Sequence, residues 1–168
     1  MTLDEINGLD REAFVVRLGH VAEHSPWVAY GAFDDAPFAN ALELVAGFRG
    51  AIARESEERQ IALIRAHPDL AGRAALAGEL TEESTREQAS VGLDALSPDE
   101  YALFHERNDA YRERFGFPFV ICARESTRQS ILAAYASRLE NDSHAEIAIA
   151  LDEIVKIIRL RIADILGG

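Results

Sequence analysis

A histidine followed directly by a proline is the residue pair in this sequence best suited to proton transfer. His67 precedes Pro68 in the segment AHPDLAG, and the residue before a proline is pushed from helical towards extended backbone. The preceding helix must therefore end at this point, which puts an imidazole at the edge of a loop. Imidazole donates or accepts a proton near neutral pH, so His67 is a candidate general acid or base. The alternative is that His67 only caps its helix.

A second polar set lies on the helix expected to open at Thr81. Ser84 precedes Glu87 by three positions and Gln88 by four, so one helical face can present a hydroxyl, a carboxylate and an amide. These groups suit a small ligand that is rich in hydrogen-bonding atoms. Because the same helix carries further charged residues, the alternative is that this face is simply solvated.

An uninterrupted apolar run, FPFVICA at residues 117–123, contains a proline and predicts a buried extended segment. No second run of this kind is available to pair with it, so its backbone amides need other partners. Those partners are a bound polar ligand, neighbouring side chains or water. Cys122 lies inside the run, where apolar neighbours raise a thiol pKa and favour packing over nucleophilic chemistry.

The apolar final helix contains two arginines, Arg159 and Arg161. A guanidinium group binds carboxylates or planar imide-like groups through paired hydrogen bonds, which makes either arginine a candidate ligand contact. The alternative is a salt bridge to one of the 29 acidic residues of the chain. Spacing does not decide which of the two arginines turns inward.

The segment HVAEH at residues 20–24 matches a two-histidine pattern found in some zinc peptidases. On one helix His20 and His24 would lie a turn apart and could share a metal, which would make the protein a zinc hydrolase. Pro26 ends that helix, however, and no third ligand is identifiable. A helix end with partly exposed imidazoles is the simpler interpretation, and we expect no metal site.

Helical periodicity runs through nearly the whole chain, and polar caps divide it into roughly eight helices. Residues 37–54 form one of them, and residues 69–80 are expected to be irregular or a short helix. Glu100 and Glu146 each stand at the third position of an expected capping box. We predict an all-α protein, one domain over residues 1–168, with its one extended segment at 117–123. The expected helix starts are Asp10, Ser25, Ser56, Thr81, Ser97, Ser126 and Ser143.

Composition limits the partners that the protein can have. The 168-residue chain has a net charge of −12 and no cluster of basic residues, which argues against nucleic acid as a partner. No apolar run approaches the roughly 20 residues that cross a bilayer, and neither a signal-peptide pattern nor an SKL-type terminus is present. A single cysteine excludes an internal disulfide framework. We expect a cytoplasmic protein with no nucleic-acid and no membrane partner.

Taken together, these segments resemble the OHCU decarboxylase family (2-oxo-4-hydroxy-4-carboxy-5-ureidoimidazoline decarboxylases). The matching segments are EHSPWVA at 23–29, AHPDLAG at 66–72, STREQASVGLDALSPDE at 84–100, YRERFGFPFVICARE at 111–125 and RLRIADIL at 159–166. They cover most of the chain, and HPDL together with FGFPFVICAR is the most specific part. The sequence departs from the family at Arg107-Asn108, where Leu-Asn is usual, and we expect that position to be structural.

The resemblance implies an all-α homodimer that acts as a carboxy-lyase without a metal or organic cofactor. Its substrate would be OHCU, which in the ureide pathway of urate and purine degradation loses CO₂ to give (S)-allantoin. The implied catalytic residues are His67, a proton donor or acceptor, and Glu87, its acidic partner. The alternative is a non-catalytic helical module that binds a partner through its acidic surface and final helix. The implied substrate contacts are Pro68, Ser84, Gln88, Phe119, Val120, Ile121, Cys122, Ala123 and Arg161.

Overall fold

Short helices with polar caps build the protein, as a computed structural model that describes residues 1–167 shows. These residues form ten α-helices and no β-strand, so the all-α prediction is confirmed. The number exceeds the expected one by two five-residue helices. One is α1, which is too short to show periodicity, and the other is α6, which lies in the stretch 69–80 for which a short helix is one of the two expectations. No helix in this range is both long and apolar enough to cross a membrane. The helices are α1 (Leu3–Asn7), α2 (Arg11–Leu18), α3 (Trp27–Ala32), α4 (Ala41–Ala53), α5 (Glu57–Arg65), α6 (Arg73–Ala77), α7 (Glu82–Ser90), α8 (Pro98–Phe115), α9 (Arg128–Arg138) and α10 (Ser143–Ile165).

Four helix starts lie where the sequence predicts them. In α2, α5, α7 and α8 an amide of the first turn donates to the side chain of the expected cap, which is Asp10, Ser56, Thr81 or Ser97. Ser97 and Glu100 form the expected capping box, and Gly116 ends α8 with a left-handed φ of 74°. These local signals position α7 and α8, the two helices that flank the predicted site.

Four helix starts differ from the prediction. The helix expected over residues 37–54 is α4, which begins only at Ala41 because the Asn40 side chain caps it. α3 and α9 each begin one residue later than expected, after Pro26 and Thr127. At α10 the carboxylate of Asp142 accepts the first-turn hydrogen bond at 2.8 Å, so Ser143 is already helical. The capping box expected between Ser143 and Glu146 is therefore wrong, because Glu146 turns into the core instead.

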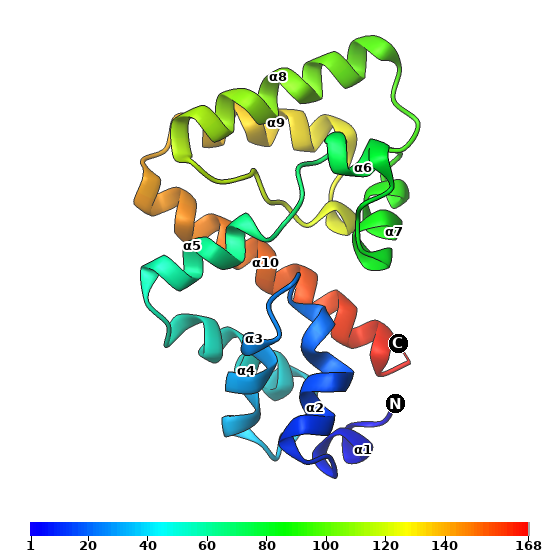
Figure 1. Cartoon of the computed structure of the whole chain (residues 1–168), viewed down its shortest axis with the longest axis vertical. Helices are drawn as coiled ribbons and strands as arrows, with labels where there is room; N and C mark the ends of the chain where they lie inside the picture. Colours follow the sequence, from blue (N-terminus) through cyan, green and yellow to red (C-terminus); the bar gives the residue numbers. More distant parts are fainter. Residues whose placement is uncertain (168) are drawn as a thin grey trace. The chain divides into compact units, whose positions relative to one another are not determined.

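The described residues form two compact units. One consists of Met1–Ala66 with the chain from Ile154 onwards, and the other of His67–Glu153. All the predicted site residues except Arg161 belong to the unit 67–153. Within this unit α8 and α9 lie side by side (Figure 1), and α7 packs against the 3-10 helix η3 (Ala123–Glu125).

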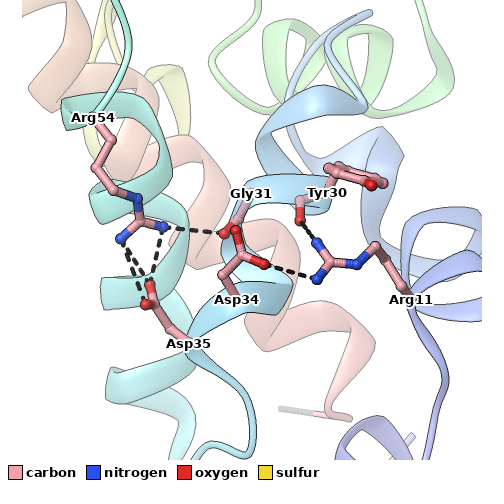
Figure 2. A network of polar contacts seen from close by, with 6 residues as sticks. All are labelled: Arg11, Tyr30, Gly31, Asp34, Asp35 and Arg54. Atoms are coloured by element: carbon pink, nitrogen blue, oxygen red, sulfur yellow. Dashed lines mark hydrogen bonds and ion pairs between the residues drawn. The ribbon is translucent and has the colours of Figure 1, made fainter.

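Ion pairs at the surface of the first unit tie the end of α3 to α2 and α4. Figure 2 shows Arg11 donating to Asp34 at 2.7 Å and Arg54 donating to Asp35 at 3.2 Å. Each arginine also donates to a backbone carbonyl of α3. Because these side chains are substantially exposed, each pair contributes at most about 1 kcal/mol to stability.

The second unit contains a buried carboxylate with several donors. Glu146 has no exposed surface, and it accepts hydrogen bonds from Arg138 at 2.9 Å, from Asn141 at 2.8 Å and from the Tyr111 hydroxyl. Burial first, and then the hydrogen bond to Glu146, raises the pKa of Tyr111 well above its usual value. The phenol therefore stays protonated and remains a donor to the carboxylate. The protein tolerates a buried carboxylate here because Glu146 is paired with the Arg138 guanidinium and accepts hydrogen bonds from three side chains.

Removing this carboxylate should destabilise the protein far more than removing a surface one. Glu146→Ala leaves the Arg138 guanidinium buried without its partner, a change that costs about 3–5 kcal/mol of unfolding free energy. The control Asp34→Ala breaks the exposed pair with Arg11 and should cost about 1 kcal/mol or less. Urea unfolding followed by circular dichroism measures both. Equal losses for the two variants would contradict the assignment of Glu146 to the core.

Candidate active site

His67 begins an irregular loop that leads from α5 to α6. The C-cap of α5 is Ala66, so the helix ends before Pro68 as predicted, and His67 lies beyond the cap instead of serving as one. Only 6% of His67 is exposed, and its Nε2 atom is buried. Pro68 is half-buried. The sequence thus correctly places an imidazole at the start of a loop, and the structure adds that the imidazole lies inside the protein.

Side chains from two helices hold the backbone of this loop. The Ala71 amide donates to Gln88 Oε1 at 2.9 Å, and Gln88 Nε2 donates to the Asp69 carbonyl at 3.3 Å. From α8, Asn108 Nδ2 donates to the Leu70 carbonyl at 2.8 Å. Ala71 has a left-handed φ of 49°, which costs a non-glycine residue about 1–2 kcal/mol. The three hydrogen bonds offset this free-energy cost. Three consecutive residues after Pro68 are therefore fixed by polar side chains.

Asn108 belongs to this site, although the sequence alone predicts only a structural role for it. It is 3% exposed, and its Oδ1 accepts a hydrogen bond from the Tyr135 hydroxyl at 2.5 Å. The signal in the sequence is weak: asparagine is a poor helix former, and here it stands in the middle of an 18-residue helix. A buried contact with a carbonyl 38 positions away explains its presence there.

The polar face of α7 points into the protein. Ser84 and Gln88 are 5% and 6% exposed, Glu87 is half-buried, and the exposed residues Glu82 and Arg86 lie elsewhere on the helix. The interpretation of a solvated face is therefore wrong. A buried hydroxyl, a buried amide and a half-buried carboxylate are available on one helix for polar contacts.

Residues 117–122 form neither helix nor strand and are mostly buried, as predicted, whereas Ala123 already begins the 3-10 helix η3. The backbone of residues 117–122 finds partners among side chains: the Cys122 amide donates to Glu153 at 2.8 Å, and Arg138 donates to the Val120 carbonyl at 2.7 Å. Of the alternatives that the sequence left open, neighbouring side chains thus account for these two groups. Ile121 is half-buried, and the buried residues of the predicted contact set are Phe119, Val120, Cys122 and Ala123.

α7 packs against the 3-10 helix that directly follows Cys122. Burial is the main cause that raises the pKa of the Cys122 thiol to about 11, and the carboxylates of Glu125, Glu153 and Glu87 add to it. Glu87 comes from α7. The structure therefore brings α7 and the end of the segment 117–122 close together within the unit 67–153.

Arg161 belongs to the other unit and turns inward there. It is 4% exposed and donates to the buried Glu23 carboxylate at 2.8 Å, while Arg159 is half-buried. The salt bridge that the sequence analysis gave as the alternative is therefore present. A contact between Arg161 and the substrate stays a prediction.

The two histidines of the zinc alternative do not share a helical face. α2 ends at Leu18, His20 lies in the 3-10 helix η1 (Gly19–Val21), and His24 has a φ of 46° that is incompatible with a helix. Among residues 1–167 no group of three or more histidine, cysteine or acidic side chains is arranged to hold a metal ion.

Comparisons with known proteins give consistent matches. The family model for OHCU decarboxylase matches residues 7–163. The chain is 42% identical to the 2-oxo-4-hydroxy-4-carboxy-5-ureidoimidazoline decarboxylase of Haloferax volcanii, over 98% of this chain and 95% of the relative. It is 41% identical to the protein of that name from Amia calva, over 99% and 95%. A crystal structure of (S)-allantoin synthase matches with a TM-score of 0.77 and 26% identity, covering 98% of this chain and 54% of that one.

The matched range includes every segment that carries a predicted site residue. The all-α fold, the buried polar site and the similarity to OHCU decarboxylases together define a carboxy-lyase. The chain belongs to the OHCU decarboxylase family, as its motifs indicated. Membership in a family of enzymes favours the catalytic prediction over the non-catalytic interaction module.

Cys122 should be nearly inert in the native protein. A pKa of about 11 in place of the ordinary 9.0 lowers the thiolate fraction about 100-fold, and only 2% of the residue is exposed. Alkylation by iodoacetamide at pH 8, followed by mass spectrometry, should be at least about 100-fold slower in the native protein than in urea. Equal rates in the two conditions would show that the thiol is accessible and ionised.

Proposed function

We propose that this protein decarboxylates OHCU to (S)-allantoin in urate degradation, without a metal or organic cofactor. The observation that carries the proposal is the family match over residues 7–163, which spans His67, Glu87 and the buried polar face of α7. The buried imidazole at the head of a tightly held loop adds support, because a proton donor acts best from a fixed position.

The reaction asks little of the protein beyond positioning. The bond between the ring carbon and the carboxylate breaks, CO₂ leaves, and the electron pair moves into the neighbouring C=N of the ring. This leaves a C=C bond between the two ring carbons and a negative charge on the ring nitrogen. The carbon of the former C=N then takes up one proton, and the hydroxyl proton passes to the nitrogen as the hydroxyl becomes a carbonyl. Because the substrate itself accepts the electrons, the protein supplies charge stabilisation and one proton. We assign His67 to proton transfer and Glu87 to the role of its acidic partner, and delivery from one fixed side gives one enantiomer.

The proposed substrate contacts combine side chains with backbone. Pro68, Ser84 and Gln88 surround the substrate, the backbone of residues 119–123 lines the pocket, and Arg161 binds a carboxylate or imide-like group. Gln88 uses its oxygen and one N–H to hold the loop, so its second N–H remains for the substrate. Ser84 is buried, which suits a hydroxyl that binds a ligand.

We further propose that residues 1–168 act as one domain, and that two copies form a cytoplasmic homodimer whose ligand is OHCU, with no nucleic-acid or membrane partner. The dimer rests on the family resemblance, and the location on the acidic composition and single cysteine. Sedimentation equilibrium should give twice the chain mass of 18.5 kDa. A single species of 18.5 kDa at micromolar concentration would refute the dimer.

The assigned role of His67 predicts a large kinetic defect. His67→Asn keeps a polar side chain of similar reach but removes the titrating ring, so kcat should fall about 10²–10⁴-fold. Freshly generated OHCU is the substrate, and circular dichroism follows the optically active allantoin. Glu87→Gln should lower kcat as well, by a smaller factor, since it removes a charge but no reacting proton.

The matched control is His144→Asn, because His144 is exposed on α10. It should retain full activity, and all assays contain EDTA and no added cofactor. Thermal unfolding confirms that each variant is folded. A wild-type protein that gives no optically active allantoin would refute the proposed function, and an active His67→Asn would refute only the role of His67.

A further inference from the structure

We infer that Tyr135 and Asn108 form a positioning pair that holds the loop carrying His67 in its working conformation. The inference rests on the proposed function and adds two residues to it. Neither is assigned a role by the family resemblance. The two residues lie on α9 and α8, which are neighbours in the unit 67–153 (Figure 1).

Both side chains are committed to one chain of hydrogen bonds. The Tyr135 hydroxyl donates to Asn108 Oδ1 at 2.5 Å, and Asn108 Nδ2 donates to the Leu70 carbonyl at 2.8 Å. Tyr135 has no exposed surface, and Asn108 and Leu70 are 3% and 6% exposed. Water therefore has little access to replace either bond, and a break leaves a buried polar group without a partner.

The polarity of this chain is fixed from its loop end. A backbone carbonyl can only accept, so the amide group of Asn108 must direct its Nδ2 towards Leu70 and its Oδ1 towards Tyr135. Tyr135 must then be the donor. Burial, followed by the charge of Asp69, raises the pKa of the Tyr135 phenol far above its usual range, so the donor proton is kept at every working pH.

Tyr135 also contacts the second irregular segment of the site. Its ring stacks on Phe119 with centroids 3.8 Å apart and an angle of 21° between the planes. One residue thus touches the segment 117–123 with its ring and orients the His67 loop through its hydroxyl. These two contacts can be separated by mutation, because Tyr135→Phe keeps the ring and removes only the hydroxyl.

The hydrogen bonds to this loop bear on catalysis because the residues that they hold follow His67 closely in the chain. Asp69, Leu70 and Ala71 are held directly, and His67 precedes them by only a few bonds of a loop that begins with a rigid Pro68. A shift of about 1 Å in a reacting group can cost about 100-fold in rate. Tyr135 and Asn108 are therefore positioning residues, which should affect kcat more than substrate binding.

The test compares two tyrosines that are equally buried. Tyr135→Phe should lower kcat at least about tenfold while KM changes less than about threefold, because proton transfer depends on the position of His67. Tyr111→Phe removes an equally buried hydroxyl, which donates to Glu146, accepts from Arg138 Nη2 and makes no bond to the His67 loop. Arg138 keeps its bond to the Val120 carbonyl in this variant, because that bond uses Nη1. Tyr111→Phe should lower the melting temperature by a similar amount and leave kcat within about twofold of the wild-type value. Equal kcat for the two folded variants would overturn the inference.

A spectroscopic measurement separates this inference from the proposed function. In ¹H–¹⁵N spectra of the histidine rings, the signal lost in His67→Asn identifies His67. That signal should shift in Tyr135→Phe and stay in place in Tyr111→Phe, whether or not the wild type forms allantoin. An unmoved His67 signal in Tyr135→Phe would overturn the inference while leaving the proposed function intact. A wild type that forms no allantoin, together with a shifted His67 signal in Tyr135→Phe, would refute the proposed function and leave the inference intact.

Discussion

A helical protein that buries irregular backbone has to satisfy that backbone with side chains, because no neighbouring strand is present to do so. Buried amides and carbonyls without partners are among the costliest features a fold can contain. This protein buries most of two such segments, residues 67–72 and 117–122, in one unit. Side chains of the surrounding helices bind backbone groups of both segments, and those side chains are Gln88, Asn108, Arg138 and Glu153.

The same constraint produces a site suited to small-molecule chemistry. The middle of a helix presents only side chains, since its amides and carbonyls are used internally, whereas irregular segments also offer backbone groups. Hydrogen bonds from the side chains of several helices restrict the motion of these segments, and preorganised proton delivery requires such rigidity. The buried Glu146–Arg138 pair extends the arrangement, because Arg138 holds both that carboxylate and the Val120 carbonyl. Arg138 therefore contributes to the stability of the unit and also holds one carbonyl of the segment 117–122.

Much of this arrangement follows from local signals in the sequence. Ser97 with Glu100, Thr81 and Gly116 fix the ends of α7 and α8, and the apolar run with its proline correctly predicts an extended segment. His67 was found because a proline must end the helix before it. Each of these signals acts over a few residues, so it can be recognised without the fold.

Long-range pairings could not be predicted in this way. Glu146 fits a capping box equally well in the sequence, and only the presence of Arg138 and Tyr111 across the unit explains its burial. Asn108 meets Leu70 and Tyr135 at sequence separations that carry no periodic pattern. Such contacts depend on how the helices pack, which the order of residues along one helix does not encode.

Hydrogen exchange at the amides of Ala71 and Cys122 tests the central claim most directly. The Ala71 amide donates to the buried Gln88 of α7 at 2.9 Å, and the Cys122 amide donates to the half-buried Glu153 of α10 at 2.8 Å. If side chains truly hold the irregular segments, both amides should exchange only through global unfolding, with the same free energy as the core of α8. Exchange through local openings, at rates typical of exposed loops, would contradict the account.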